Sequence, residues 1–228
     1  MARTDRKLET SGLEPVALIR EISDMVPLTY RCAAGRGGNV NQGADQRPRR
    51  VVVVGSTGAG KTTLAKALAA RLEYPYVELD SLHWDANWTP APRELFRTRV
   101  AAALDTDTWV ADGNYSMARD LVWERADTLI WLDYSLWVIV PRLILRSLRR
   151  GIVRHELWNG NRERITELFS PKSLVVWALQ THARRRREYP KVLAQPQFAQ
   201  LRVIRHASPR ETDRWLRTFA ESYFGHPP

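Results

Sequence analysis

The chain has 228 residues and a formal net charge of +10, a length that allows one sizeable domain with or without an appendage. Cys32 is the only cysteine, which excludes an intramolecular disulfide. The longest apolar stretch, residues 136–145, contains Pro141 and Arg142 and is shorter than the roughly 18–20 apolar residues that a membrane-spanning helix needs. With no secretory signal pattern at the N-terminus, we expect a soluble cytoplasmic protein.

Residues 1–48 differ in composition from the rest of the chain. A short amphipathic helix is predicted within Glu14–Met25, and the stretch 33–48, rich in Gly, Asn and Gln, predicts disorder. Two interpretations stay open: a regulatory or targeting arm, or a dispensable tail that includes an extension from an upstream start codon. We expect residues 49–228 to form the folded domain.

From Arg50 onward, short β-branched runs alternate with helical periodicity. Strands are predicted at Val51–Val54, Tyr76–Leu79, Thr108–Ala111, Thr128–Leu132 and Leu201–Ile204. Helices are predicted at Lys61–Leu72, Pro92–Leu104, Met117–Arg125, Leu136–Arg150, Pro171–Arg187 and Pro209–Tyr223, the last capped by Ser208. Strands that alternate with helices indicate an α/β fold in which a five-stranded parallel sheet is flanked by helices.

The segment between the first strand and the first helix fits the pattern G-x-x-x-x-G-K-[ST] at every fixed position. It reads Gly55, Ser56, Thr57, Gly58, Ala59, Gly60, Lys61, Thr62, and Thr63 follows in the same helical turn. Glycines let several amide N–H groups converge on a phosphate at a helix N-terminus. We therefore expect ATP to bind here, with Lys61 on the β- and γ-phosphates and the Thr62 hydroxyl as a ligand of Mg²⁺.

Three carboxylates follow predicted strands at the edge where the phosphate loop lies. Asp112, in the segment 109–115, is expected to hold Mg²⁺ through a water molecule, and Asp80 is expected to orient or deprotonate an acceptor hydroxyl. For both residues the alternative is a cap on the following helix or turn. For Asp133 we expect that structural role.

Aromatic residues flank the same rim, and their faces could stack on a base or a sugar. They are His83, Trp84, Trp88 and Tyr115. The alternative, that these side chains pack under the loop as ordinary core, stays open.

The positive charge is concentrated in one stretch. Residues 142–187 carry twelve basic and three acidic side chains, a net charge of +9, which suits a polyanionic partner. The arginines nearest the break between two helices are Arg142, Arg146, Arg149, Arg150, Arg154, Arg162 and Arg164. On a closing lid, expected at about 149–170, they would stabilise a transferring phosphoryl group, with Arg146 and Arg150 as the catalytic candidates. The run 184–187 is expected to be a solvated basic face.

The order of these motifs resembles a family of small P-loop proteins identified as adenylate-kinase-like or as DNA topology modulation (FlaR-type) proteins. The resemblance covers about Arg50 to Tyr223. It rests on the phosphate loop, on Leu79-Asp80-x-x-His83-Trp84, on Asp112-Gly113-Asn114-Tyr115 and on the segment 125–133.

The resemblance implies a nucleoside-monophosphate-kinase-like fold with an arginine-rich lid. It implies that Pro92–Leu104 forms the acceptor side and that the donor base lies near Arg205–Pro209. Two features depart from ordinary adenylate kinases. The usual adenylate kinase acceptor-site pattern is missing, with Arg119 no more than a candidate for the AMP-binding arginine after the third strand, and the segment 158–163 differs from the usual lid.

Three hypotheses follow from these residues. The first is an ATP-dependent kinase that transfers the γ-phosphoryl group to a small-molecule acceptor, of which a nucleotide is one alternative. The second is an ATP-regulated nucleic-acid-binding protein, although no helix-turn-helix or zinc module supports it. The third is a plain ATPase.

Overall fold

The computed structural model describes residues 47–153, 158–161 and 174–224. The helix expected at Glu14–Met25 lies outside these residues, and so do the lid arginines Arg154, Arg162 and Arg164. The side chain of Arg150 also lies outside the described part.

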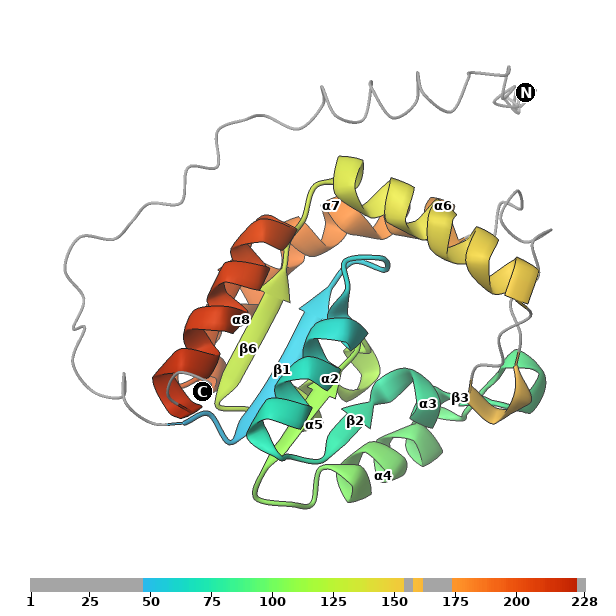
Figure 1. Cartoon of the computed structure of the whole chain (residues 1–228). Coiled ribbons are helices and arrows are strands. Elements are labelled where there is room, and N and C mark those ends of the chain that lie inside the picture. The colour runs from blue at the N-terminus through green and yellow to red at the C-terminus, as the bar shows by residue number, and fades with distance from the viewer. Residues whose placement is uncertain (1–46, 154–157, 162–173, 225–228) are drawn as a thin grey trace, which may run out of the picture. The chain divides into compact units, whose positions relative to one another are not determined.

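A parallel sheet forms the centre of the domain (Figure 1). Its strands are β1 (Arg50–Gly55), β2 (Tyr76–Glu78), β5 (Trp109–Asp112), β6 (Thr128–Leu132) and β7 (Arg202–His206). The order across the sheet is β2-β5-β1-β6-β7, and each neighbouring pair is parallel. This arrangement confirms the predicted α/β class with a five-stranded parallel sheet.

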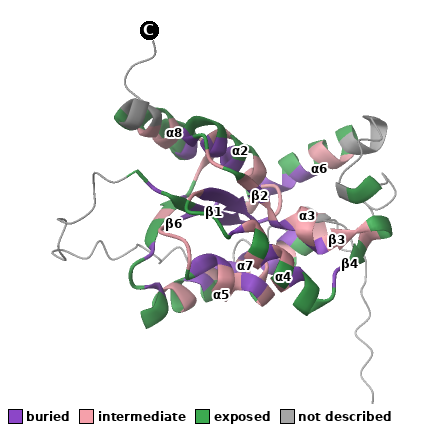
Figure 2. Cartoon of the chain, turned by 90° about the horizontal axis from the view of Figure 1, so that it is seen from below, coloured by how far each residue is buried: buried purple, intermediate pink, exposed green. Residues whose placement is uncertain are grey.

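The alternating valines of β1 show how the two faces are filled. Val51 and Val53 face a core that includes side chains of α2 (Lys61–Leu72), α6 (Leu136–Val153) and α8 (Pro209–Phe224). Val52 and Val54 face the other core, which is built from α4 (Arg93–Ala103) and α5 (Arg119–Trp123). Figure 2 shows β1 buried between these layers. A strand covered on both faces explains the uninterrupted β-branched run.

The remaining long helix, α7 (Leu174–Leu193), contributes to both cores. Ala178 near its start belongs to the first core, and Tyr189 near its end belongs to the second. The helix is longer than predicted because it continues past Arg187 and accommodates Pro190 near its C-terminal end. It therefore passes the edge of the sheet where the phosphate loop lies.

The chain after β2 differs most from the sequence prediction. The strand stops at Glu78, and Leu79 begins the short helix α3 (Leu79–His83). A two-stranded antiparallel hairpin follows, formed by β3 (Trp84–Asp85) and β4 (Thr89–Pro90) with the 3₁₀ turn η1 (Ala86–Trp88) between them. Elements this short leave no periodicity that a sequence can reveal.

Other short 3₁₀ turns join the larger elements. They are η2 (Ser116–Ala118), which precedes α5, η3 (Trp158–Gly160) and η5 (Pro196–Phe198). The predicted cap of the last helix is confirmed, because the Glu211 amide donates to Ser208 Oγ (3.3 Å). The Glu211 carboxylate in turn accepts from the Ala207 amide (2.7 Å).

Candidate functional site

The phosphate loop joins the end of β1 to the start of α2. Gly60 stands at the N-cap of α2 with φ 97°, and no side chain caps the helix. Gly58 also has positive φ, and a Cβ added there would lie 2.6 Å from Leu143 Cγ on α6. Glycine is therefore required at both positions. The uncapped amides at the start of a twelve-residue helix form a cradle that fits a phosphate group.

Side chains from distant elements hold this loop. The Asn114 amide group, which follows β5, both accepts from the Gly55 amide (3.1 Å) and donates to the Gly55 carbonyl. Tyr189 OH on α7 donates to the same Asn114 Oδ1 (3.1 Å). Ser56 Oγ bonds to Nδ1 of the buried His182, also on α7 (3.1 Å). The backbone of the loop is thus fixed on two sides before any ligand arrives.

Thr62 and Asp112 meet as the motif predicts. Thr62 Oγ1 donates to Asp112 Oδ2 (2.7 Å), and Tyr76 OH donates to Asp112 Oδ1 (2.8 Å). Burial raises the pKa of Asp112, and its hydrogen bond from Thr62 opposes that rise. A hydroxyl beside one carboxylate fits Mg²⁺, which commonly takes one or two protein oxygens and completes its shell with water and substrate phosphates. Accordingly, the described residues contain no cluster of three acidic, His or Cys side chains that could hold a metal alone.

Lys61 lies where several charged groups converge. Burial lowers its pKa, the carboxylates of Asp80 and Asp112 raise it, and the guanidinium groups of Arg185 and Arg146 lower it. The ammonium Nζ also donates to the Ser56 carbonyl (3.3 Å). Asp80 and Asp112 thus both lie near enough to Lys61 to affect its pKa, as expected if the predicted acceptor carboxylate and the loop lysine share one site.

Asp80 is held by an aromatic hydroxyl. Tyr115 OH donates to Asp80 Oδ1 over 2.6 Å. Burial raises the pKa of Tyr115, and the negative charge of Asp80 adds to this rise, so the hydroxyl remains the donor. Asp80 lies near the start of the short helix α3 rather than after a longer strand. The hydrogen bond to Tyr115 gives its carboxylate one defined orientation.

The aromatic side chains predicted at the rim pack largely against one another. His83 is buried and contacts the rings of Trp84 (4.8 Å), Phe96 (5.1 Å) and Tyr115 (4.6 Å). Burial lowers the pKa of His83, so its imidazole is held neutral. Trp84 and Trp88 pack edge to face at 5.7 Å and are partly exposed. Packing therefore accounts for His83, and the two tryptophans remain candidates for ligand contact.

The arginines of α6 occupy distinct positions. Arg142 Nη1 reaches the Ala59 carbonyl of the phosphate loop (3.5 Å), and Arg146 lies near enough to lower the pKa of Lys61. Arg149 is exposed. Among the predicted catalytic arginines, Arg146 is thus brought to the site, whereas the side chain of Arg150 lies outside the described residues.

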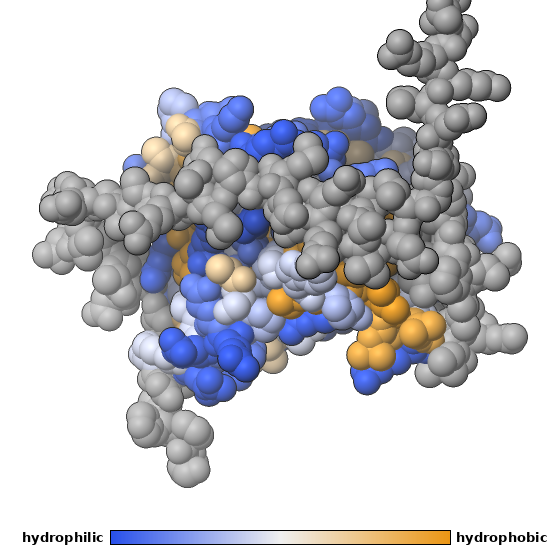
Figure 3. All heavy atoms as spheres, turned by 90° about the horizontal axis from the view of Figure 1, so that it is seen from above, coloured by the Kyte–Doolittle hydropathy of each residue, from blue (hydrophilic) through white to orange (hydrophobic). Residues whose placement is uncertain are grey.

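The face of α6 that turns away from the site is apolar. Trp137, Ile144, Leu145 and Leu148 are all exposed, and their spacing places them on one side of the helix. Figure 3 shows an apolar patch among hydrophilic atoms on the side viewed from above. Among the described helices, all are too short or too polar to cross a bilayer.

The expectation that Asp133 caps the next helix or turn is wrong. Its carboxylate is buried and pairs with two guanidinium groups: Arg186 Nε donates to Oδ1 (2.8 Å), and Arg205 Nε donates to Oδ2 (3.0 Å). The guanidinium of Arg205 also lies over the Trp131 ring at 4.7 Å. The physical reason is that a carboxylate this deep requires charged partners, and α7 and β7 supply them.

The prediction that residues 184–187 form a solvated basic face is correct for two of the four arginines. Arg184 and Arg187 are exposed, but Arg185 is buried against Thr181 Oγ1 (2.8 Å) and Arg186 binds Asp133. The spacing of His182, Arg185, Arg186 and Tyr189 places them on one inward face of α7. This i, i+3, i+4, i+7 pattern was the sequence signal for the residues that support the loop.

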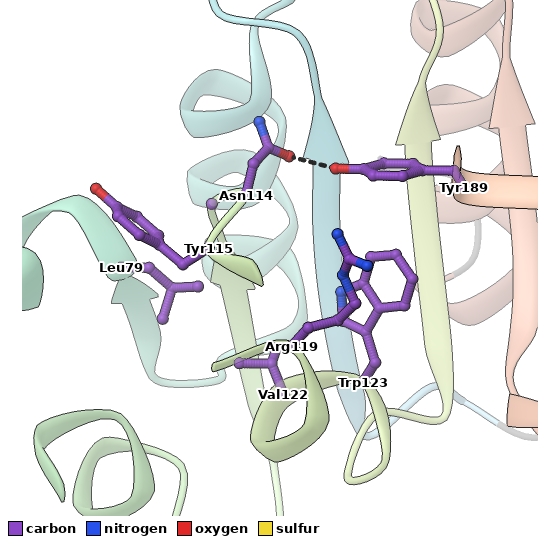
Figure 4. Close-up of a pocket in the computed structure, with 8 residues that line it drawn as sticks. Leu79, Asn114, Tyr115, Arg119, Val122, Trp123 and Tyr189 are labelled. Carbon is purple, nitrogen blue, oxygen red and sulfur yellow. Dashed lines mark hydrogen bonds between the residues drawn. The ribbon is translucent and has the colours of Figure 1, made fainter. Parts of the chain in front are cut away.

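Arg119 lines a small pocket beside the Asn114–Tyr189 hydrogen bond (Figure 4). Its guanidinium stacks over Trp123 (5.0 Å) and lies 5.8 Å from the centre of the Tyr189 ring. Leu79, Gly113, Tyr115 and Val122 complete the lining. Arg119 thus packs among aromatic rings next to the side chain that holds Gly55, and its role in binding an acceptor stays a prediction.

Comparison with known proteins gives partial matches. Residues 51–107, a quarter of the chain, match the family model described as "ATPase family associated with various cellular activities (AAA)". A probable gluconokinase of Schizosaccharomyces pombe (strain 972 / ATCC 24843) is 53% identical over 36 residues, which are 16% of this chain and 19% of that protein. The match therefore spans about a fifth of that relative's length.

Two solved structures are similar in fold. A shikimate kinase from Bacteroides thetaiotaomicron aligns with a TM-score of 0.46 and 18% identity, over 77% of this chain and 98% of the other. A gluconokinase from Sinorhizobium meliloti 1021 aligns with a TM-score of 0.43 and 22% identity, over 78% and 96%. The family-model match, over residues 51–107, includes the phosphate loop, Lys61 and Asp80.

Proposed function

We propose that this protein is an ATP-dependent kinase that phosphorylates a hydroxyl group of a small-molecule acceptor. The observation that carries the proposal is the joint placement of Lys61 and Asp80. Asp80 lies within electrostatic reach of the loop lysine but outside the Thr62–Asp112 pair that suits a metal. A carboxylate held in this way by Tyr115 can take the proton of the attacking oxygen, and the assay below decides whether that oxygen belongs to an acceptor or to water.

The donor half follows from the loop. The amides at the start of α2 and the Lys61 ammonium bind the phosphates of ATP, and Thr62 with Asp112 would hold Mg²⁺ directly or through water. When bound, Mg²⁺ neutralises part of the charge on the phosphates. The neighbouring guanidinium of Arg146 adds positive charge at the same place.

In the acceptor half, Asp80 receives the proton of the acceptor hydroxyl. The acceptor oxygen forms a bond to the γ-phosphorus as the bond between that phosphorus and the β–γ bridging oxygen breaks, and ADP leaves. The hydroxyl proton passes to the Asp80 carboxylate, whose other role is to orient the hydroxyl. Tyr115 holds Asp80 Oδ1 throughout, so that Oδ2 is the oxygen available to the acceptor.

A coupled ADP-release assay tests the proposal. The panel contains nucleoside monophosphates, nucleosides and small hydroxy acids, with Asp80→Asn as the control enzyme. We expect at least one acceptor to raise ATP turnover well above the rate with water, and the increase to vanish in Asp80→Asn. If no acceptor exceeds water, the kinase proposal fails and a plain ATPase is the better description.

The likeness of the motifs to adenylate-kinase-like proteins makes a nucleotide one member of this panel rather than the assigned acceptor. DNA binding is weaker as a proposal, because much of the described basic stretch is engaged within the protein. Arg184 pairs with Glu188, Arg185 bonds to Thr181, and Arg186 binds Asp133. Gel shifts at about 150 mM salt, with and without ATP, would detect a DNA role.

A further inference from the structure

The hairpin at 84–90 has an unusual backbone. Its strands pair through Trp84–Pro90 and Asp85–Thr89, and both Asn87 (φ 60°) and Trp88 (φ 54°) adopt left-handed conformations. Asparagine tolerates this region, but a bulky residue such as tryptophan is rarely found there. An isolated two-stranded hairpin is also marginally stable in water. Something outside the hairpin must therefore hold this turn in shape.

Two asparagines beyond α6 provide that support. Asn161 Oδ1 accepts from the Trp88 amide (2.8 Å), and its Nδ2 donates to the Asp85 carbonyl (2.9 Å). Asn159 Nδ2 donates to the Trp84 carbonyl (2.6 Å). Three main-chain groups of the hairpin are thus satisfied by two side chains more than seventy residues away. The Asn161 side chain joins groups three residues apart, so it closes the turn from outside.

Burial distinguishes the two asparagines. Asn161 is only 3% exposed, whereas Asn159 is exposed. A buried amide that makes both of its hydrogen bonds to main chain is costly to replace, because its partners would be left unpaired. Asn161 is accordingly the main support, and Asn159, which itself has φ 55°, is the lesser one.

The hairpin connects directly to the proposed acceptor site. Trp84 follows α3, which carries Asp80, and its ring contacts His83, whose ring contacts Tyr115. On the opposite side, Arg99 of α4 donates to the Leu82 carbonyl (3.0 Å) and pairs with Asp85 Oδ1 (2.9 Å). Displacement of the hairpin would therefore move the rim that stands over Asp80.

We propose that Asn161 is a positioning residue for the acceptor half of the site: by closing the turn at 85–88 it fixes the hairpin and the Trp84 side of the acceptor rim. The proposal rests on the proposed kinase function for its acceptor, but its structural part concerns the hairpin alone. It assigns a role to Asn161, whose two side-chain hydrogen bonds both go to the main chain of the hairpin.

Hydrogen exchange and ATP binding on the full chain test the structural part. In Asn161→Ala, we expect the amides of residues 84–91 to exchange about tenfold faster or more, because two hydrogen bonds are lost. Exchange in β1, β5 and β6 and the Kd for a non-hydrolysable ATP analogue should stay within twofold. Asn159→Ala is the matched control and should show a smaller increase in the same peptide. Asn161→Asp keeps the side-chain shape but replaces the donor to the Asp85 carbonyl with a charged oxygen, which should also loosen the turn, so it provides a second variant if the alanine variant does not fold.

Kinetics then test the functional part, with whichever panel compound the wild-type enzyme phosphorylates. Asn161→Ala should lower kcat/KM for that acceptor about tenfold or more, while KM for ATP is unchanged. Unchanged exchange at 84–91, or faster exchange throughout the sheet, overturns the positioning role. A loosened hairpin with unchanged acceptor kinetics overturns its link to the acceptor. If the wild-type enzyme has no acceptor at all, the kinase proposal fails, and the exchange data alone decide whether Asn161 holds the hairpin.

Discussion

The proposed donor and acceptor halves of the site are built in different ways. The donor half is a run of consecutive residues, 55–62, completed by Asp112 on the adjacent strand β5. The acceptor half combines Asp80, Tyr115 and a hairpin that is closed by a side chain from residue 161. A contiguous motif can be read in a sequence, whereas an assembly of distant side chains becomes visible only when the chain is folded.

The two halves also differ in what determines their geometry. In the donor half, glycine backbone conformations shape the loop, since Gly58 and Gly60 adopt positive φ, and Asn114 then holds the loop at Gly55. In the acceptor half, side-chain hydrogen bonds hold a backbone that is strained at Trp88. A substitution in one half should therefore change either ATP binding or the use of the acceptor. The experiments below test this separation.

The largest effect is expected from Lys61→Ala. The ammonium that contacts the β- and γ-phosphates is lost, so we expect turnover to fall on the order of 10³-fold and ATP binding to weaken. Lys66→Ala on the same helix is the matched control, because Lys66 lies over the Tyr76 ring and away from the loop. Steady-state kinetics and ATP titration measure both. Equal losses in the two variants would contradict the assignment of the donor half.

Asp80→Asn should affect the acceptor half alone. Loss of the proton acceptor should lower acceptor-dependent turnover about 10²-fold, at the lower end of general-base effects, while the Kd for ATP stays within about threefold. Tyr115→Phe removes only the hydrogen bond to Asp80 and should cost less. If Asp80→Asn weakened ATP binding as strongly as turnover, the separation between the halves would not hold.

The sequence predicted the sheet because its strands are buried on both faces. Val51–Val54 and Thr128–Leu132 are almost wholly buried, so every position except Thr128 is apolar and the pattern is strong. The hairpin at 84–90 was not predicted, because two-residue strands stabilised by Arg99 and Asn161 leave no local pattern. Long, buried elements could thus be predicted from the sequence, whereas the short strands of the hairpin could not.

The same contrast applies to the site. The loop, Thr62 and Asp112 were predicted, since phosphate chemistry fixes their types and spacing. Asn114 lies in the motif 112–115, but no role was predicted for it, because its contact with Gly55 forms only when the chain is folded. Asp133 was assigned to a cap because its partners, Arg186 and Arg205, are 53 and 72 residues away.

Replacing Asp133 with asparagine tests how the sheet edge beside the loop is held. Two guanidinium groups would lose their buried anionic partner. Because each arginine is more than a third exposed, solvent would compensate in part, and we expect a loss of about 2–3 kcal/mol in the free energy of unfolding. Urea denaturation measures it. Arg184→Ala, which breaks only an exposed pair with Glu188, should cost less than about 0.5 kcal/mol.

The smallest effect concerns His182, which ties α7 to Ser56. Burial, together with the charge of Arg186, lowers the pKa of His182 to about 4, and the charge of Asp133 opposes this shift. Between pH 6.5 and about 4 the unfolded chain binds a proton at this residue and the folded protein does not, so stability falls as pH falls. Above about pH 6.5 His182 is largely neutral in both the folded and the unfolded protein, so this loss of stability is absent. Between pH 7 and pH 5 we expect a loss of about 1–2 kcal/mol from this residue.

His182→Gln keeps a side chain that can bond to Ser56 but does not titrate. Other groups contribute equally to both proteins, so the difference between their unfolding free energies isolates the histidine. The wild-type protein should lose more stability than His182→Gln over the acidic range, whereas the affinity of the folded protein for ATP should change little above about pH 4, because the folded protein keeps His182 neutral and bonded to Ser56. Identical pH dependence of unfolding in the two proteins would mean that the pKa of His182 is not lowered in the folded protein, and would contradict the burial of a neutral imidazole between α7 and Ser56.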